Sequence, residues 1–472
     1  MARGNSRSSS NRSSRSPRRA TSDGPSSGGG RHTPTPRRKT AAALGDLIAS
    51  IAPAVLRDAF EQGGRLDPAI RAALDPKQGL SFMDRRTVQH ALSALVRWWG
   101  WISPLKMVQV EEQLLLAWLL ESSEITGPCR RWAEKTNRDP WRLQPGGGAP
   151  GWTERATTLK RFMEGRMVAA DPWMLFPAWL REELTLPPGS ESAKARRLAF
   201  LFVLQIRAPI WAAVRGAPEK QVWNELRDAG LRPWVHRRLA TAAKLDRDTE
   251  LGQLESFRQG VVVVEDLASQ AVARVCDPDP GERWWDVRGG SGLQALGLGA
   301  EMAGKGTVIS TFEHERARRA AASRLRAGAF RNIAVKEWDG RHVPGKAESY
   351  DGVLLEAPSS GVGTWRRHPE ARWSLSKEQI AELVDSQKRL LTIAASAVKT
   401  GGTLVYTVAT ATQSETQGLI NDFLAENRGF RLDPFPHPLE EGTTTGMLQI
   451  WPQFHDCETR FIARMVRTTK PS

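Results

Sequence analysis

A glycine-rich turn at residues 286–292 has the residue types of a small-ligand site. It reads DVRGGSG and follows a strand-like apolar run that starts at Trp284. Glycine lets the backbone approach a ligand closely, and the N-terminus of a following helix favours negative charge. Turns of this kind are common between a strand and a helix, and this one is not the GxGxxG pattern of dinucleotide-binding proteins. The turn therefore indicates a ligand site without identifying the ligand.

A second polar loop follows another expected strand. Residues 350–364 read YDGVLLEAPSSGVGT, an apolar run that ends in an acid, Glu356, and a tight Pro/Gly loop. Basic and aromatic side chains follow at residues 365–373. Further along, residues 399–406 read KTGGTLVY, which predicts the end of a helix, a turn and a strand.

A sheet must position these loops. Strand-like runs at residues 284–287, 307–312, 333–335, 352–355 and 404–407 alternate with helical patterns, the longest at residues 376–398. This alternation predicts an α/β domain over residues 256–470, with a mainly parallel sheet covered on both faces. Ligands of such sheets bind at the carboxyl ends of the strands, where both loops are expected.

The rest of the chain divides into three parts. Residues 1–40 are rich in Ser, Arg, Gly and Pro, which predicts a disordered tail. Residues 41–145 predict a helical domain, with an apolar stripe through residues 84–101, Asp84 as an N-cap, and a buried helix at residues 114–120. A Pro/Gly linker at residues 145–150 leads to an α+β subdomain at residues 151–255. Most of the eighteen tryptophans lie among apolar residues, so we expect them in the core.

Charge and cysteine content limit the class of protein. The formal net charge is +15, and residues 1–40 contribute +9 of it, so the folded part is only mildly basic. Basic excess favours polyanions through counterion release, although a solvated charge run has the same composition. Three cysteines, Cys129, Cys276 and Cys457, predict neither disulfides nor a metal site. Without a signal peptide or an apolar run of membrane-spanning length, we expect a cytoplasmic protein without metal or membrane contact.

A basic segment with an aromatic centre offers a nucleic-acid contact. Arg232, Arg237 and Arg238 flank Trp234, a combination that suits phosphate contact and base stacking. The end of a surface helix beside a core tryptophan has the same composition, and composition alone slightly favours that simpler interpretation.

In order and spacing, the loops resemble the motifs of the RsmB/Nop/Sun family of S-adenosylmethionine-dependent RNA cytosine-5 methyltransferases. The family's first motif resembles D-x-C-A-A/G-x-G-G-K-T, its fourth D-A-P-C-S-G-x-G-T followed by R-R-x-P, and its sixth Y-x-T-C-S/T. The match covers about residues 256–467, including EDLASQ at residues 265–270, which resembles the family's Q-D-x-x-S-Q. The resemblance implies a Rossmann-like methyltransferase domain, preceded by an all-α NusB-like domain and a small α+β RNA-binding subdomain. The family's R-V-N reads AVR at residues 213–215, which puts one RNA contact in doubt.

The resemblance also implies roles for individual residues. The expected cofactor-binding residues for S-adenosylmethionine are Asp286, Gly289, Gly290, Gly292, Glu313, Asp339 and Glu356. The expected RNA-binding residues are Arg232, Arg237, Arg238, Arg366, Arg367, His368 and Trp373. Ribosomal RNA is the implied partner, and a monomer the implied state.

The catalytic positions depart from the family. Formation of 5-methylcytosine needs a thiolate that attacks carbon 6 of the base. The attacking position here is Ala409, and the position that assists product release is Ser359. The acid that holds the base is Glu356, one methylene longer than aspartate, and the acid expected to meet the ribose aligns with Phe312, next to Glu313. The cofactor loop has lost its cysteine to Arg288, with further changes at residues 293 and 294, which predicts weak cofactor binding.

Three hypotheses remain open on these residues. The first is a catalytically impaired or inactive pseudoenzyme that binds RNA and serves rRNA processing. The second is an active methyltransferase with altered chemistry, since methylation of an exocyclic nitrogen or a ribose oxygen needs no cysteine. The third is a protein-interaction module in which the tryptophan-rich helical domain is the working part.

Overall fold

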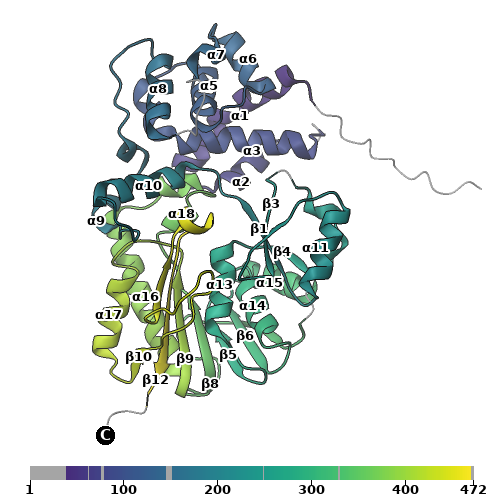
Figure 1. The fold of residues 1–472 in the computed structure, drawn as a ribbon, viewed down its shortest axis with the longest axis vertical. Coiled ribbons are helices and arrows are strands. Elements are labelled where there is room, and N and C mark those ends of the chain that lie inside the picture. The colour runs from purple at the N-terminus through teal and green to yellow at the C-terminus, as the bar shows by residue number, and fades with distance from the viewer. Residues whose placement is uncertain are drawn as a thin grey trace, which may run out of the picture.

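The computed structural model describes residues 39–61, 63–75, 79–144, 151–247, 249–327 and 330–468. The expected linker at residues 145–150 and nearly all of the expected tail at residues 1–40 lie outside these ranges. Figure 1 shows a helical part above a large sheet, with a small sheet beside the junction.

The N-terminal part is helical, as expected. Its elements are α1 (Ala41–Glu61), α2 (Leu66–Ala73), α3 (Phe82–Arg97), α4 (Trp99–Ile102), η2 (Ser103–Leu105), α5 (Val110–Glu121), α6 (Gly127–Lys135) and α7 (Pro140–Leu143). Residues 114–120 of α5 are all buried, which confirms the helix expected there. The expected N-cap was wrong: Ser81 caps α3, and Asp84 closes a capping box three residues into the helix.

The next helices share the core of the first ones. They are α8 (Trp152–Phe162), η3 (Pro172–Leu175), α9 (Leu180–Glu183) and α10 (Ala193–Gln205). Leu159, Phe162 and Leu201 belong to one hydrophobic cluster with Leu95 and Trp132. The α+β subdomain therefore begins after α10 rather than at residue 151, because the apolar faces of residues 152–205 are buried against the N-terminal helices.

A four-stranded antiparallel sheet forms the small subdomain. Its strands are β1 (Ile210–Val214), β2 (Trp234–Val235), β3 (Ala242–Leu245) and β4 (Val262–Val264), in the order β2-β3-β1-β4. The helices α11 (Glu219–Asp228), η4 (Leu251–Gln253) and α12 (Glu255–Arg258) complete it. Strand β4 lies within residues 256–470 but pairs with β1, so this subdomain ends later than expected.

The C-terminal part contains the large sheet. Its strands are β5 (Arg283–Asp286), β6 (Thr307–Phe312), β7 (Ile333–Glu337), β8 (Tyr350–Glu356), β9 (Val398–Val408), β10 (Phe430–Leu432), β11 (Met447–Ile450) and β12 (Arg460–Arg467). The order is β10-β12-β9-β8-β5-β6-β7, with β11 beside β12. Strands β5 to β9 run parallel and β12 is antiparallel to β9, which confirms the mainly parallel α/β sheet.

Helices cover both faces of this sheet (Figure 1). The elements are α13 (Leu267–Cys276), α14 (Leu293–Glu301), α15 (Glu315–Ala327), η5 (Val362–Thr364), η6 (Pro369–Trp373), α16 (Lys377–Ala397), α17 (Gln417–Glu426) and α18 (Pro452–His455). Trp284 packs in the cluster that contains α13 and α14, and its neighbour Trp285 packs with α16 and α17. Successive residues of a strand point to opposite faces of the sheet, so these two tryptophans pack against the helix layers on opposite faces.

The tryptophans are largely core residues, as expected. Trp141 and Trp234 alone are more than half exposed, at 64% and 55%.

Across the described residues, none of the helices combines the length and the apolar character that a bilayer crossing requires.

Candidate functional site

The glycine-rich turn leaves the carboxyl end of β5 and leads into α14. Gly290 and Gly292 have φ angles of 52° and 83°, in the left-handed region, and Gly292 is the N-cap of α14. A Cβ at Gly289 would lie 2.2 Å from Ser310 Oγ and 2.3 Å from the Phe312 ring. The turn therefore needs its glycines partly because β6 packs closely beneath it.

A hollow of about 1060 Å³ opens beside this turn, at the carboxyl ends of the parallel strands. Glu313 and Asp339 line it, whereas Phe312, at the aligned position of the ribose acid, is buried under the turn. Arg288 lies across from Glu313, with 3.5 Å between Nε and Oε1. The hollow thus retains two carboxylates, one of which faces a guanidinium.

Asp339 is held in place by its own loop. Its carboxylate accepts hydrogen bonds from the backbone N–H groups of Arg341 and His342, both at 2.9 Å, and contacts the His342 ring. The His342 ring and these amides hold the pKa of Asp339 well below its ordinary value. This acid is therefore ionised and fixed at the rim of the hollow.

Asp286 is a buried acid directly beneath the turn. Ser310 Oγ donates to its Oδ2 at 2.7 Å, and its Oδ1 is buried without a hydrogen-bond partner among the described residues. Burial raises the pKa of Asp286 to about 7, the charge of Glu356 adds to that rise, and the Ser310 hydrogen bond opposes it. Burial therefore favours the protonated form of this carboxyl.

These residues fit a nucleoside cofactor such as S-adenosylmethionine. The hollow lies where ligands bind in parallel sheets, and the two lining acids can accept hydrogen bonds from hydroxyl and amino groups. Asp286 is fully buried and does not line the hollow, so it supports the turn from beneath.

The positions of the two family cysteines lie close together in the fold. Ser359 follows β8 and Ala409 follows β9, and the Gly363 N–H donates to the Ala409 carbonyl at 2.9 Å. Both side chains are half-buried. No described side chain hydrogen-bonds to the Ser359 hydroxyl, and His368 faces Glu370 at 3.5 Å instead. Ser359 therefore has no base to activate it, and Ala409 has no reactive atom.

A buried carboxylate next to these positions was not predicted from the sequence. Glu415 accepts hydrogen bonds from the Ser360 N–H at 2.8 Å, the Thr412 hydroxyl at 2.6 Å and the Gln387 amide at 3.0 Å. Its partners come from the loop after β8, the loop after β9, and α16. This network holds both loops against each other, and sequence spacing gives no hint of it.

Glu356 takes part in an ion pair that the sequence did not reveal. Arg460, at the start of β12, is buried and places Nη1 2.7 Å from Glu356 Oε1. Arg367 forms two further ion pairs nearby. Its Nε lies 2.8 Å from the Glu458 carboxylate, and its Nη2 lies 3.3 Å from the Asp266 carboxylate. Burial and the Glu458 charge raise the pKa of Asp266 to about 6. The acid expected to hold a base is thus already occupied by an internal cation.

The predicted RNA-binding residues near the cleft are less available than expected. Arg366 is 1% exposed and donates to the carbonyls of Ile206, Arg207 and Cys457 and to Asp456. It ties the C-terminal domain to the segment after α10 and does not face a ligand, which corrects its expected role. Arg367 and His368 are about one-third exposed, and each already faces a carboxylate.

The basic segment at residues 232–238 is exposed. Arg232, Arg237 and Arg238 all face solvent around Trp234, which lies on strand β2 rather than at a helix end. Lys244 on the paired strand β3 lies 5.3 Å from the Trp234 ring centroid. An exposed ring with a cation against it is a platform on which a base can stack.

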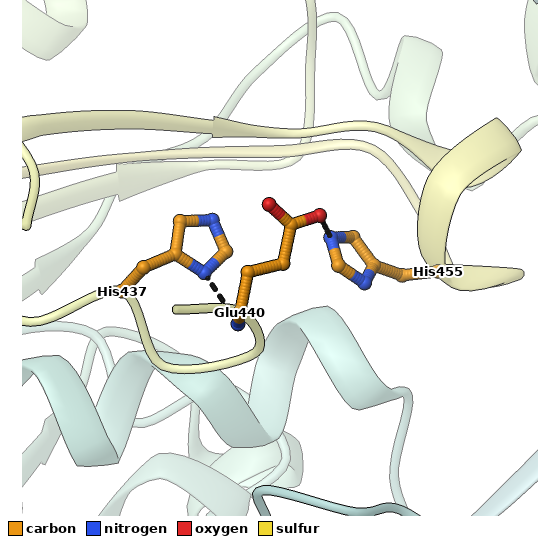
Figure 2. Close-up of side chains that lie close together, drawn as sticks. All are labelled: His437, Glu440 and His455. Carbon is orange, nitrogen blue, oxygen red and sulfur yellow. Dashed lines mark hydrogen bonds and ion pairs between the residues drawn. The ribbon is translucent and has the colours of Figure 1, made fainter. Parts of the chain in front are cut away.

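One further cluster lies outside the cleft. Figure 2 shows His437, Glu440 and His455, whose ligand-type atoms lie within 4.8 Å of one another, and Glu440 Oε1 is 3.0 Å from His455 Nε2. His437 Nδ1 accepts the N–H groups of Leu439 and Glu440, at 3.1 and 2.9 Å. The neutral ring then carries its proton on Nε2, which leaves no lone pair for a cation there. The cluster is a hydrogen-bonded group rather than a prepared metal site.

The C-terminal half of the chain is similar in sequence to known proteins. Residues 273–466 match the family described as 16S rRNA methyltransferase RsmB/F. A probable ribosomal RNA small subunit methyltransferase B from Synechocystis sp. is 33% identical over 222 residues, covering 45% of this chain and 49% of the relative. The chain thus spans about half the length of the curated relatives it matches.

Two solved structures share the fold. The crystal structure of PH0851 has a TM-score of 0.69 at 21% identity and covers 91% of this chain and 100% of that one. The structure of NSun6 from Pyrococcus horikoshii with SFG has a TM-score of 0.52 at 15% identity and covers 59% of this chain and 96% of that one.

Proposed function

We propose that this chain is an RNA-binding member of the RsmB/Nop/Sun family of S-adenosylmethionine-dependent RNA methyltransferases that does not form 5-methylcytosine. The family assignment is supported by the match of residues 273–466 to the family described as 16S rRNA methyltransferase RsmB/F. The observation that carries the proposal is the pair of catalytic positions, where Ser359 lacks a base and Ala409 lacks a nucleophile. Without a thiolate at carbon 6 of the pyrimidine, carbon 5 is not activated for methyl transfer.

The remaining cysteines do not replace the lost thiols. Cys457 is near the cleft but 1% exposed, and its thiol donates to the Glu458 carbonyl. Burial, with the added negative charge of Asp266, raises the pKa of the Cys457 thiol well above its ordinary value. Cys129 and Cys276 are also buried, and burial raises the pKa of both thiols. A thiolate is therefore disfavoured at all three positions.

The base site is altered as well. The carboxylate of Glu356 lies against the buried guanidinium of Arg460, so a cytosine has to compete with an internal cation for it. Removing Glu356 from this pair leaves a buried positive charge, which is costly. This occupied acid supports loss of the cytosine reaction independently of the missing thiols.

RNA binding is proposed for the exposed face of the small subdomain. Trp234 supplies a stacking surface, and the arginines at residues 232, 237 and 238 supply phosphate contacts. Ribosomal RNA is the proposed class of partner, since the similar proteins carry rRNA methyltransferase names. The proposed setting is a cytoplasmic monomer.

Two measurements test the proposal. The first incubates the full chain and S-adenosylmethionine with RNA that contains 5-fluorocytosine, which traps the covalent intermediate. We expect no protein–RNA adduct from the natural chain, and an adduct would refute loss of the cysteine reaction. An active family member serves as the positive control for the trapping conditions.

The second measurement is RNA binding by Trp234→Ala. Stacking contributes about 1–3 kcal/mol per base, so we expect affinity to fall by roughly 5- to 150-fold. Trp141→Ala is the matched control, because Trp141 is similarly exposed but lies on the helical part. Equal affinity of both variants and the natural chain would contradict this RNA-binding face.

A second candidate function is favoured by one observation, the retained hollow with Glu313 and Asp339. There, S-adenosylmethionine would supply a transferable methyl group to a nucleophile that needs no cysteine, such as an exocyclic nitrogen. Glu313 and Asp339 would hold the cofactor, and the turn at residues 289–292 would approach it. Calorimetric titration decides between the candidates, since no heat of binding at millimolar cofactor excludes methyl transfer.

A further inference from the structure

Two adjoining hollows lie where the helical part meets the segment that leads from α10 into β1. Their volumes are about 480 and 380 Å³, and they share His90, Ser122 and Arg207 in their walls. Because of these shared walls they form one groove, here called the junction groove. It is separate from the cofactor hollow, whose lining it does not share.

Arginines crowd the walls of the junction groove. Arg207 lines both hollows, Arg86 the first and Arg247 the second. Burial lowers the pKa of Arg207 to about 10, and the positive charges of Arg86 and Arg247 add to that effect. Arg207 is thus close enough to Arg86 and Arg247 to be repelled by both.

No acid of the described residues forms an ion pair with Arg207, although the charge of Glu121 acts on it. Its guanidinium makes no hydrogen bond or ion pair with any described residue, although the side chain is half-buried. Arg247 Nη2 donates to the Arg207 carbonyl at 2.7 Å and its Nε to the Ala208 carbonyl at 3.3 Å, so backbone oxygens fix it. Among the described residues, neither guanidinium forms an ion pair with a carboxylate, although the charge of Asp456 acts on Arg247.

The acids of the groove are mostly engaged elsewhere. Asp84 is 1% exposed and accepts hydrogen bonds from the Ser81 N–H and the Ser81 hydroxyl. Glu121 is buried and binds Arg97 at 2.7 Å and the Trp98 indole at 3.0 Å. Glu124 is exposed at the edge. The groove therefore keeps a positive excess on its accessible walls.

Further basic side chains adjoin the junction groove. Lys39 lines the wall of its first hollow. On the other side, Arg247 follows Lys244 by three residues, about 10 Å along an extended chain, and Lys244 packs against Trp234. A single strand of nucleic acid stacked on Trp234 can thus reach the groove.

We propose that the junction groove binds the phosphodiester backbone of the RNA, with Arg207 and Arg247 as contacts. The inference rests on the RNA-binding function proposed above and adds a second contact surface to it. Guanidinium groups bind phosphate oxygens through paired, charge-assisted hydrogen bonds, and a bound phosphate offsets the repulsion of Arg207 by Arg86 and Arg247. No base is read here, so the groove contributes affinity and orientation without sequence preference.

The test measures binding of a fluorescently labelled, structured ribosomal RNA fragment to the full chain over a series of KCl concentrations. The logarithm of the binding constant K falls as the logarithm of the salt concentration rises. Each lost phosphate contact reduces the steepness of this negative slope by about 0.7–0.9. We expect Arg207→Ala and Arg247→Ala each to lower the slope by about that amount, and the double variant by about twice as much. Arg142→Ala is the matched control, because Arg142 is 88% exposed on the helical part outside the groove.

Each outcome separates the two proposals. If the natural chain binds and the double variant keeps its affinity and slope, the junction groove is overturned while RNA binding stands. If the natural chain fails to bind at any salt concentration, RNA binding itself is overturned, and the inference falls with it. If a poly-glutamate peptide binds in an Arg207-dependent way and RNA does not, the groove takes a protein partner and the RNA assignment is wrong. Thermal melts of all variants confirm that they fold.

Discussion

The buried carboxyl of Asp286 makes a sharp prediction about stability and pH. Its pKa is raised from 3.8 to about 7 in the folded chain, chiefly by burial. Between these two values the unfolded chain releases the proton and the folded chain retains it, so the stability of the natural protein falls as pH rises. A difference of about three pKa units at about 1.4 kcal/mol each sets the limit of this loss near 4 kcal/mol.

Asp286→Asn removes the titration and keeps the shape of the side chain. Ser310 can still donate its hydroxyl proton to the Asn carbonyl oxygen. We expect the free energy of unfolding of the variant, minus that of the natural chain, to grow between pH 4 and pH 8, by up to about 4 kcal/mol. Urea unfolding of both proteins at four pH values measures this difference.

Asp351→Asn is the control of opposite sign. Burial raises the pKa of Asp351. Its hydrogen bonds with Lys399 and with the Arg283 N–H lower the pKa by more than burial raises it, so the net pKa is below the ordinary value. This carboxylate stabilises the fold above the unfolded pKa, and the stabilisation is lost as pH falls. Its replacement is therefore costlier at pH 7 than at pH 3. A pH-independent difference for Asp286→Asn would refute the argument from burial.

Three further perturbations follow from the contacts. Glu356→Gln leaves the buried Arg460 with a weaker partner, and because Glu356 is one-third exposed we expect a loss of about 1–3 kcal/mol in urea unfolding; Arg460→Met in the same chain should recover part of it. Ser81→Ala removes the cap of α3 and should lower stability by about 1 kcal/mol, and no change would show that the capping box is dispensable. Gly363→Ala places a Cβ about 2.0 Å from the Thr459 carbonyl oxygen, so we expect a markedly lower melting temperature. An unchanged melting temperature would mean that the loops carrying Gly363 and Thr459 separate easily.

The strands and helices of the C-terminal domain were predictable because their signals are local. Alternation of apolar runs and helical patterns predicted β5 to β8 and α16 within a few residues, whereas β9 begins at Val398 and includes the expected turn after α16. The boundary of the small subdomain was not predictable, because the apolar faces of residues 152–205 look the same whether they pack on the first helices or on the sheet.

The chemistry divides in a similar way. Residue identity alone gives the loss of both thiols at Ser359 and Ala409, since a missing sulfur is missing in any fold. Residue identity also suggested Arg366 as an RNA contact, yet its neighbours bury it in a structural role. Whether an arginine is a surface contact or an internal tie depends on its neighbours, which the sequence does not specify.

The sequence by itself thus determined the class of domain, the expected ligand sites at strand ends and the absence of a cysteine nucleophile, because those follow from local pattern and residue type. The tertiary structure alone decided which charges meet: Arg460 pairs with Glu356, Glu415 lies between two loops, and Arg207 forms no ion pair within the described part of the chain. The residues of the Arg460–Glu356 pair are 104 positions apart in the sequence. Electrostatic energy depends on distance and burial, which only the folded chain fixes.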